Sequence, residues 1–255
     1  MFRSSSSPAI VLRKNRVGEI HKALHMLTPE AGLISAIAHG AYKMKSRLRL
    51  ASEPFGYVRV YLYHDPVKEQ FKITDLESID LFERIRASVE KFFTASLWAE
   101  AVLKSFGGGE SFGELFGLLR DALKLLDQSP AGGETRVSMQ FLIRFLSLLG
   151  YAPDLESCSD CGRPLKERET LLLKRGGLEL LCPECAPGAG EAAGLLLSPG
   201  GRRYLEATRA MKLERAVQVG LEAGAMGALK ALLHAYLQTA LDIRLNTLRV
   251  GAEIL

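Results

Sequence analysis

An α+β fold with more than one domain is what the 255-residue sequence predicts, and three observations support it. The first 80 residues contain short runs in which apolar and polar residues alternate, a pattern typical of strands. From about residue 79, apolar residues recur every three or four positions, a pattern typical of helices. Four cysteines then fall between residues 158 and 185. We therefore expect a β domain over residues 1–80 and an α-helical domain over residues 81–255, with a cysteine ribbon inserted at about residues 155–190.

The β domain is expected to contain five short strands. Residues 57–63 show the clearest alternation, with Val58, Val60 and Leu62 on one face and tyrosines and Arg59 on the other. The five expected strands are residues 9–14, 19–27, 33–41, 57–63 and 70–74. This number of short strands in a small domain predicts an OB-fold barrel.

The helical domain is expected to contain helices over residues 79–105, 112–126 and 137–149, and another that starts near Met226. Glycine-rich segments at residues 107–109 and 129–133 are expected to connect the first three. Leucines at helical spacing line the last helix, and we expect its apolar face to continue through Leu245 and Leu248.

Composition excludes two classes of protein. Hydrophobic residues make up 47% of the chain and charged residues 24%, which excludes wholesale disorder. Apolar runs fall far short of the roughly 20 residues of a membrane-spanning helix. The apolar stretch at residues 9–12 is also shorter than the core of an export signal, for which about 7–15 residues are needed. The sequence therefore predicts a soluble, cytoplasmic protein.

Positive charge is concentrated at the beginning of the chain. Residues 1–60 contain ten Lys and Arg against three Asp and Glu, whereas residues 81–255 contain 21 of each. Such asymmetry is typical of a face that binds a polyanion. A basic face that is merely solvated explains the composition equally well.

The cysteines are the strongest signal in the sequence. Cys158, Cys161, Cys182 and Cys185 follow the spacing C-x2-C-x20-C-x2-C, which suits two knuckles around one tetrahedral Zn2+. The spacer contains Gly176-Gly177 between two leucine-rich runs and predicts a β-hairpin. Two disulfides fit a reducing cytosol poorly, and a redox site needs only one such pair. We therefore expect a structural zinc ion with no open position for catalysis.

Candidate nucleic-acid contacts lie in the basic first quarter. If residues 43–49 are extended, their cations stand on one face about 6.6 Å apart, near the spacing of phosphates in an extended single strand. The alternative is a charged loop, and tyrosines on the neighbouring strand are also common for structural reasons. The expected nucleic-acid-binding residues are Lys43, Lys45, Arg47, Arg49, Arg59, Tyr61, Arg13 and Lys14.

Two patterns that resemble catalytic or metal motifs favour structural interpretations. Residues 109–113 match G-x-S-x-G around Ser111, but a helix is expected before the motif instead of the strand that a nucleophile elbow requires. Ser111 suits a helix cap, and His234 lies on a leucine-lined helix. His21 and His25 in a strand lie about 13 Å apart, too far to share one ion. We therefore expect no enzyme activity.

The order of these parts resembles the bacterial RecO family. The resemblance extends over essentially the whole chain, and the segments that carry it are AIVLR (9–13), GE (18–19), TPEAGL (28–33), GAYKMKSRLR (40–49), EPF (53–55) and FLSLLGY (145–151). It implies a recombination mediator in DNA repair that binds single- and double-stranded DNA and anneals complementary strands. With RecR, such a protein helps to load RecA onto DNA coated by single-stranded DNA-binding protein.

Several site assignments follow from that resemblance. It implies DNA contacts at the basic segment and zinc at the four cysteines. It also implies that the tail of single-stranded DNA-binding protein contacts the helical domain near the helix before the cysteines, with Arg136 and Arg144 as candidates. A nucleoid-associated location in the cytoplasm would accompany these roles.

Two other classes remain open from the residues. An RNA-binding accessory protein of transcription or translation would share the barrel and the ribbon, and it should prefer structured RNA to DNA. An esterase built on Ser111 is the enzymatic alternative, and replacement of Ser111 by Ala would test it.

Overall fold

The computed structural model describes residues 4–44, 46–65, 70–105, 112–186, 194–252 and 254–255. Contacts divide the chain into two compact units, Met1–Pro130 with Arg249–Leu255, and Ala131–Leu248. The predicted change from strands to helices near residue 80 coincides with the end of β5, but the compact units divide at Pro130. No helix within the described ranges is long and apolar enough to cross a bilayer.

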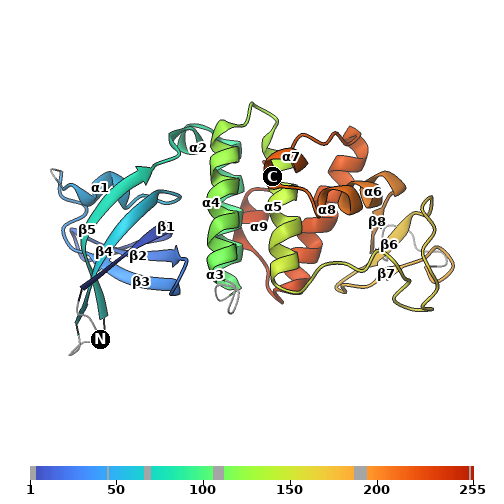
Figure 1. The fold of residues 1–255 in the computed structure, drawn as a ribbon, viewed down its shortest axis with the longest axis horizontal. Helices are drawn as coiled ribbons and strands as arrows, with labels where there is room; N and C mark the ends of the chain where they lie inside the picture. Colours follow the sequence, from blue (N-terminus) through green and yellow to red (C-terminus); the bar gives the residue numbers. More distant parts are fainter. Residues whose placement is uncertain (1–3, 45, 66–69, 106–111, 187–193, 253) are drawn as a thin grey trace. The chain divides into compact units, whose positions relative to one another are not determined.

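The first unit contains a closed five-stranded barrel with strand order β1-β2-β3-β5-β4 (Figure 1). Its strands are β1 (Ser4–Val17), β2 (His21–Thr28), β3 (Gly32–Ala38), β4 (Tyr57–Asp65) and β5 (Gln70–Asp80). The β1–β2, β2–β3, β4–β5 and β1–β4 ladders are antiparallel, while β3 and β5 pair in parallel over three residues. The predicted OB-like barrel is confirmed.

The barrel interior follows the alternation read in the sequence. Val58 and Val60 of β4 are fully buried and Leu62 nearly so, while Arg59 between them is exposed. Small and β-branched side chains fill most of the narrow interior, as a five-stranded barrel requires. The buried cluster consists of Ala9, Val11, Leu24, Met26, Ala36, Ala38, Ala41, Ala51, Val58, Val60, Leu62, Ile73 and Leu76.

The helices of this unit are α1 (Leu48–Ala51), α2 (Glu83–Ala87), α3 (Val89–Lys104) and α4 (Phe112–Gln128). The single helix expected over residues 79–105 is wrong. Residues 79–80 belong to β5, Phe82 has a left-handed backbone (φ 45°), and the extended Ser88 separates α2 from α3. Ser88 caps α3 by accepting a hydrogen bond from the Lys91 amide.

The turn between β2 and β3 lies against the start of α4. Gly32 has φ +63°, and a Cβ there would lie 2.6 Å from the ring of Phe112. Both the backbone conformation and the close approach therefore require glycine at this position. Residues 29–31 form the turn itself.

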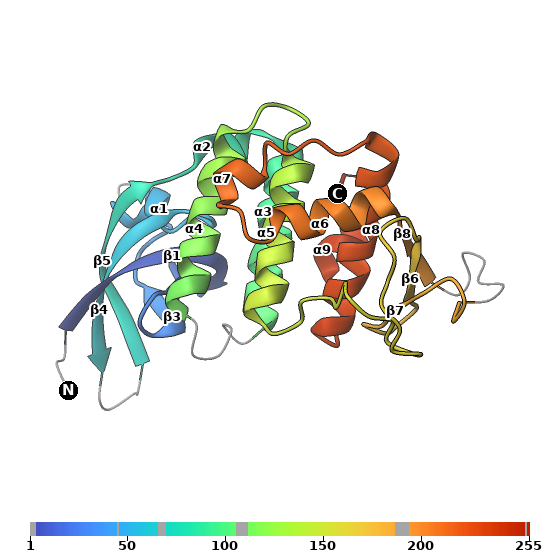
Figure 2. The same ribbon diagram turned by 45° about the vertical axis from the view of Figure 1, so that its right-hand side comes forward.

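The second unit combines helices with a three-stranded sheet of order β7-β6-β8 (Figure 2). Helix α8 contacts α5, α6 and β8, so it lies at the centre of this unit. The elements are α5 (Glu134–Leu148), β6 (Leu171–Lys174), β7 (Leu180–Leu181), β8 (Gly194–Leu197), α6 (Pro199–Thr208), α7 (Leu213–Ala216) and α8 (Ala223–Ala240). Helix α9 (Asn246–Val250) straddles the division between the units.

Helix ends in this unit have identifiable causes. Gly150 (φ +81°) ends α5 in a Schellman motif, in which the Tyr151 amide donates to the Leu146 carbonyl and the Gly150 amide to Ser147. Helix α8 stops at Ala240, before Asp242 adopts φ 50°. The expectation of a continuous helical face through Leu245 is therefore wrong, although Leu245 is buried.

Candidate functional site

The four cysteine sulfurs form a compact cluster in the second unit. All four Sγ atoms lie within 4.8 Å of one another, and Cys161 Sγ lies 3.9 Å from Cys182 Sγ. Tetrahedral coordination at a Zn–S distance of about 2.3 Å separates sulfurs by about 3.8 Å, whereas a disulfide needs about 2.05 Å. The cluster therefore has the dimensions of a metal site, and the donor set fits a thiophilic ion.

Backbone hydrogen bonds build the two knuckles. In the first, the Gly162 amide donates to the Cys158 carbonyl and Gly162 has φ +72°. In the second, the amides of Cys185 and Ala186 both donate to the Cys182 carbonyl. The Cys182 amide donates to Cys158 Sγ at 3.3 Å, which joins the two turns. The local chain therefore directs all four thiols to one point.

The knuckle amides also favour the thiolate of Cys158. Burial opposes ionisation, but backbone amides of Cys161, Cys182 and Asp160 point at the sulfur and lower the pKa of Cys158 to about 6. Outside the sulfur cluster, Arg163 forms ion pairs with Glu169 at 2.9 Å and Glu184 at 3.2 Å. Arg163 thus ties the loop after the first knuckle to the second knuckle, as supporting residues around metal ligands commonly do.

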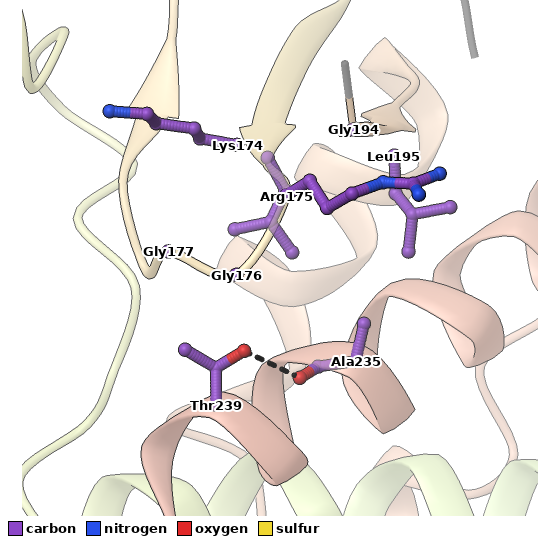
Figure 3. Close-up of a pocket in the computed structure, with 9 residues that line it drawn as sticks. Lys174, Arg175, Gly176, Gly177, Gly194, Leu195, Ala235 and Thr239 are labelled. Atoms are coloured by element: carbon purple, nitrogen blue, oxygen red, sulfur yellow. Dashed lines mark hydrogen bonds between the residues drawn. The ribbon is translucent and has the colours of Figure 1, made fainter. Parts of the chain in front are cut away.

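The hairpin between the knuckles is confirmed, and β8 adds a third strand that the sequence reading missed. Leu172 pairs with Leu181 and Leu173 with Leu180. The glycine turn lies over α8 and lines a cavity of about 240 Å³, in which Arg175 runs toward Leu195 and Lys174 points to the other side (Figure 3). The Thr239 hydroxyl on the α8 side donates to the Ala235 carbonyl, so this polar group is already paired.

The basic segment, defined here as residues 42–53, is not an extended strand. The amides of Lys43, Ser46 and Arg49 each donate to the carbonyl three residues before them, which makes consecutive turns that lead into α1. The extended conformation, on which the 6.6 Å spacing depended, is therefore wrong for the described residues, which follow the alternative of a charged loop. Lys43, Arg47 and Arg49 are nevertheless exposed, while Lys45 lies outside the described residues.

The surroundings of these three cations favour binding of an anion. Among the described residues, none of Lys43, Arg47 and Arg49 takes part in an ion pair. Arg16 lies 5.6 Å from the ring centre of Tyr42, so a further cation lies at the beginning of the same segment. Arg16 was not predicted from the sequence, because it is far from Tyr42 along the chain. The two side chains come together only in the folded barrel, where the end of β1 lies beside the basic segment.

Three of the four other barrel candidates have acidic neighbours. Lys14 pairs with Glu53, whereas Arg13 is exposed and contacts Asn15. Arg59 and Tyr61 on β4 face Glu77 and Asp75 across the β5 ladder. The Glu77 carboxylate accepts a hydrogen bond from Tyr61 and raises the pKa of that phenol. The β4 face is thus less positive than the basic segment.

Family models match nearly the whole chain. Residues 1–82 match the model described as Recombination protein O N terminal, and residues 86–249 match Recombination protein O C terminal. The chain belongs to the RecO family.

Individual RecO proteins are similar over different lengths. The DNA repair protein RecO of Desulfosudis oleivorans is 32% identical over 258 residues, which cover 98% of this chain and 97% of that protein. Those of Heliobacterium modesticaldum and Pelotomaculum thermopropionicum are 36% and 39% identical over 65% and 60% of this chain. The chain matches 58% of the length of each of these two relatives, less than two thirds.

In this RecO-family chain, the two candidates for partner contact differ. Arg144 is half-buried, and its guanidinium donates to the backbone carbonyls of Gln140, Thr208 and Met211. Burial lowers the pKa of Arg144. Arg144 therefore ties α5 to the end of α6 and the turn that follows it, whereas Arg136 is only partly covered and lies near Tyr204.

The possible esterase depends on a serine that the structure does not describe. Ser111 and most of its glycine-rich motif lie outside the described residues, so the helix-cap interpretation stays a prediction. His234 lies in α8, where burial and the charge of Lys230 lower the pKa of its imidazole to about 4. His21 and His25 lie on β2 as expected, and His21 Nδ1 accepts from the Gly40 amide.

Proposed function

We propose that this chain is a DNA-binding recombination mediator that binds single- and double-stranded DNA without reading sequence and anneals complementary strands. One observation supports this most directly: a RecO-family barrel presents exposed Lys43, Arg47 and Arg49 with no carboxylate paired to them in the described structure. Neutralised phosphates would let two like-charged strands approach each other. A cytoplasmic, nucleoid-associated location is part of the same proposal.

Annealing of complementary oligonucleotides tests this proposal. The wild-type chain should accelerate annealing of bare strands and of strands coated with single-stranded DNA-binding protein. Replacing both Arg47 and Arg49 by glutamate should abolish the acceleration, because the surface that holds the strands becomes acidic. An excess of structured RNA should compete poorly, and better competition by RNA than by DNA would favour the RNA-binding class instead.

We propose that the four-cysteine cluster holds a structural Zn2+. Cys158, Cys161, Cys182 and Cys185 would supply four thiolates, which fill a tetrahedral shell and leave no site for substrate. Because the four thiolates come from two separate knuckles, metal binding would supply folding free energy to both knuckles and to the β6–β7 hairpin between them.

The proposed protein partners are RecR and single-stranded DNA-binding protein, with RecA an indirect one. For the acidic, apolar tail of single-stranded DNA-binding protein, the proposed contact is the surface around a small apolar pocket in the second unit, which residues of α5, α6 and α8 line. Its lining includes Ile143, Leu146, Leu205 and Leu233, with the exposed Arg209 available to an acidic group.

A matched pair of variants, one within α6 and one at the residue that follows it, tests this partner site. Arg209→Glu should weaken binding of a peptide with the sequence of that tail, because it replaces the cation that lines the cavity. Arg203→Glu makes the same charge change at an exposed position of α6 that does not line the cavity, and it should bind normally. Equal weakening in both variants would show general electrostatics instead of a defined site.

A further inference from the structure

One lysine of the barrel is buried beneath the basic segment. In β2, Lys22 alternates with Leu24 and Met26 and points into the barrel as they do. Only 1% of its surface is exposed, and it is among the largest fully buried side chains of the described chain. An ammonium in such a place is costly unless polar partners surround it.

The partners of Lys22 come from both ends of the basic segment. At the far end, its Nζ donates to Ser52 Oγ at 2.7 Å, to the Arg49 carbonyl at 3.2 Å and to Glu53 Oε1 at 2.9 Å. At the near end, Nζ lies 4.9 Å from the ring centre of Tyr42. A single buried cation therefore contacts the first residue of the segment and its last turn.

We propose that Lys22 is a positioning residue, which holds the basic segment in one conformation so that Lys43, Arg47 and Arg49 are presented together to phosphates. Lys22 cannot meet a phosphate itself, because it is buried; it acts through the backbone of Arg49 and through Ser52 and Glu53. The inference rests on the proposed DNA-binding function. A segment that is already in its binding conformation loses less conformational entropy when DNA binds. A more mobile basic segment should therefore bind DNA with lower affinity.

Lys91 provides a matched comparison in the same unit. It is 6% exposed, and its Nζ donates to the carbonyls of Asp127 at 2.9 Å and Ser129 at 2.7 Å. Both lysines are thus buried ammonium groups that donate hydrogen bonds to the backbone of another segment, but only Lys22 contacts the basic segment. Loss of a purely structural lysine can therefore be separated from loss of a positioning one.

The experiment compares Lys22→Met, Ser52→Ala, Lys91→Met and wild type in the full chain. Lys22→Met should fold, because Glu53 keeps its Lys14 partner and the Ser52 hydroxyl still donates to the Arg49 carbonyl. Hydrogen exchange is read at the Arg49, Ser52 and Glu53 amides, which donate within the segment. Affinity for a fluorescent thymidine oligonucleotide is measured at one low salt concentration, and limited trypsin digestion reports cleavage after Lys43, Arg47 and Arg49.

We expect faster exchange and faster trypsin cleavage in Lys22→Met. DNA affinity should fall about tenfold if the segment then holds its binding conformation about a tenth of the time. Ser52→Ala should show the same changes to a smaller degree, because two other hydrogen-bond acceptors of Lys22, the Arg49 carbonyl and Glu53, remain. Lys91→Met should keep segment protection and DNA affinity within about twofold of wild type.

Three outcomes would overturn the inference. Wild-type affinity in Lys22→Met despite a loosened segment would show that positioning does not matter. Equal loss of affinity in Lys22→Met and Lys91→Met would show only general destabilisation. Wild-type affinity in the Arg47→Glu, Arg49→Glu double variant would overturn the DNA interface itself, which is a different result from failure of Lys22→Met alone.

Discussion

Replacing Arg47 and Arg49 together by glutamate should flatten the salt dependence of DNA binding. Three described cations of the basic segment are exposed, and if each neutralises one phosphate, log affinity for a single strand should fall against log salt with a slope of about −2.1. Affinity should then fall about 20-fold between about 50 and 200 mM salt. Without Arg47 and Arg49 the slope should be about −0.7, and the same salt change should cost only about threefold.

Fluorescence anisotropy of a labelled thymidine oligonucleotide, titrated at several salt concentrations, measures these slopes directly. Arg168→Glu with Arg175→Glu is the matched control, since both arginines are exposed residues of the ribbon and the charge change is identical. The control should keep the wild-type slope. If the basic-segment variant kept the wild-type slope and affinity, the segment would be a solvated surface and the phosphate contacts would lie elsewhere.

Three other predictions concern the second unit. Cys182→Ser removes a fully buried thiol of the proposed zinc site, so elemental analysis should show zinc falling from about one equivalent to under half. Wild type below half an equivalent would contradict the zinc proposal. Arg144→Met removes charged hydrogen bonds to three carbonyls and should lower the free energy of unfolding, measured in urea, by about 2–3 kcal/mol. A loss under about 0.5 kcal/mol would mean that these hydrogen bonds do not stabilise the fold. The pKa of His234 is about 4 in the folded chain against 6.5 as its ordinary value, so the unfolded chain binds more protons between these values. Stability should fall as pH drops from 6.5 toward 4, by up to about 3 kcal/mol more in wild type than in His234→Gln, and parallel pH profiles would refute this.

Patterns that report burial predicted the structure well. Val58 and Val60 alternate with exposed or half-exposed neighbours because one face of β4 lines the barrel, and the leucines of residues 171–181 mark a hairpin for a similar reason. Cysteine spacing located the sulfur cluster because the knuckle geometry is local. Each of these signals depends on residues close to one another in sequence.

The alternation of cations in the basic segment led to the wrong prediction of an extended strand, because no β ladder includes that segment in the described structure. Alternation reports the two faces of a strand only where a neighbouring strand holds the backbone extended. Here Gly40 with φ +70° starts a turn, and three amides bond to nearby carbonyls instead. Lys22 was overlooked although its alternation with Leu24 and Met26 is visible, because its partners lie about 30 residues away along the chain.

Helix α6 shows a signal that was present but unused. Ser198 precedes Pro199, and in the structure the serine hydroxyl accepts from the Gly201 amide while the proline occupies the first helical turn. Serine at the cap followed by proline is a typical helix start. The short helix lacks a long apolar repeat, so periodicity alone did not identify it.

The pairing of β1 with β4 also has a consequence for synthesis of the chain. Ser4 to Ile10 of β1 pair with Tyr63 to Tyr57 of β4, so this half of β1 leaves the ribosome about 50 residues before its partner. At about 5–20 residues per second, the strand waits roughly 3–10 s with its backbone unpaired. Ser4 to Ser7 make this waiting edge polar, which discourages pairing with other nascent chains. An apolar strand of equal length would carry a greater aggregation hazard at this stage of synthesis.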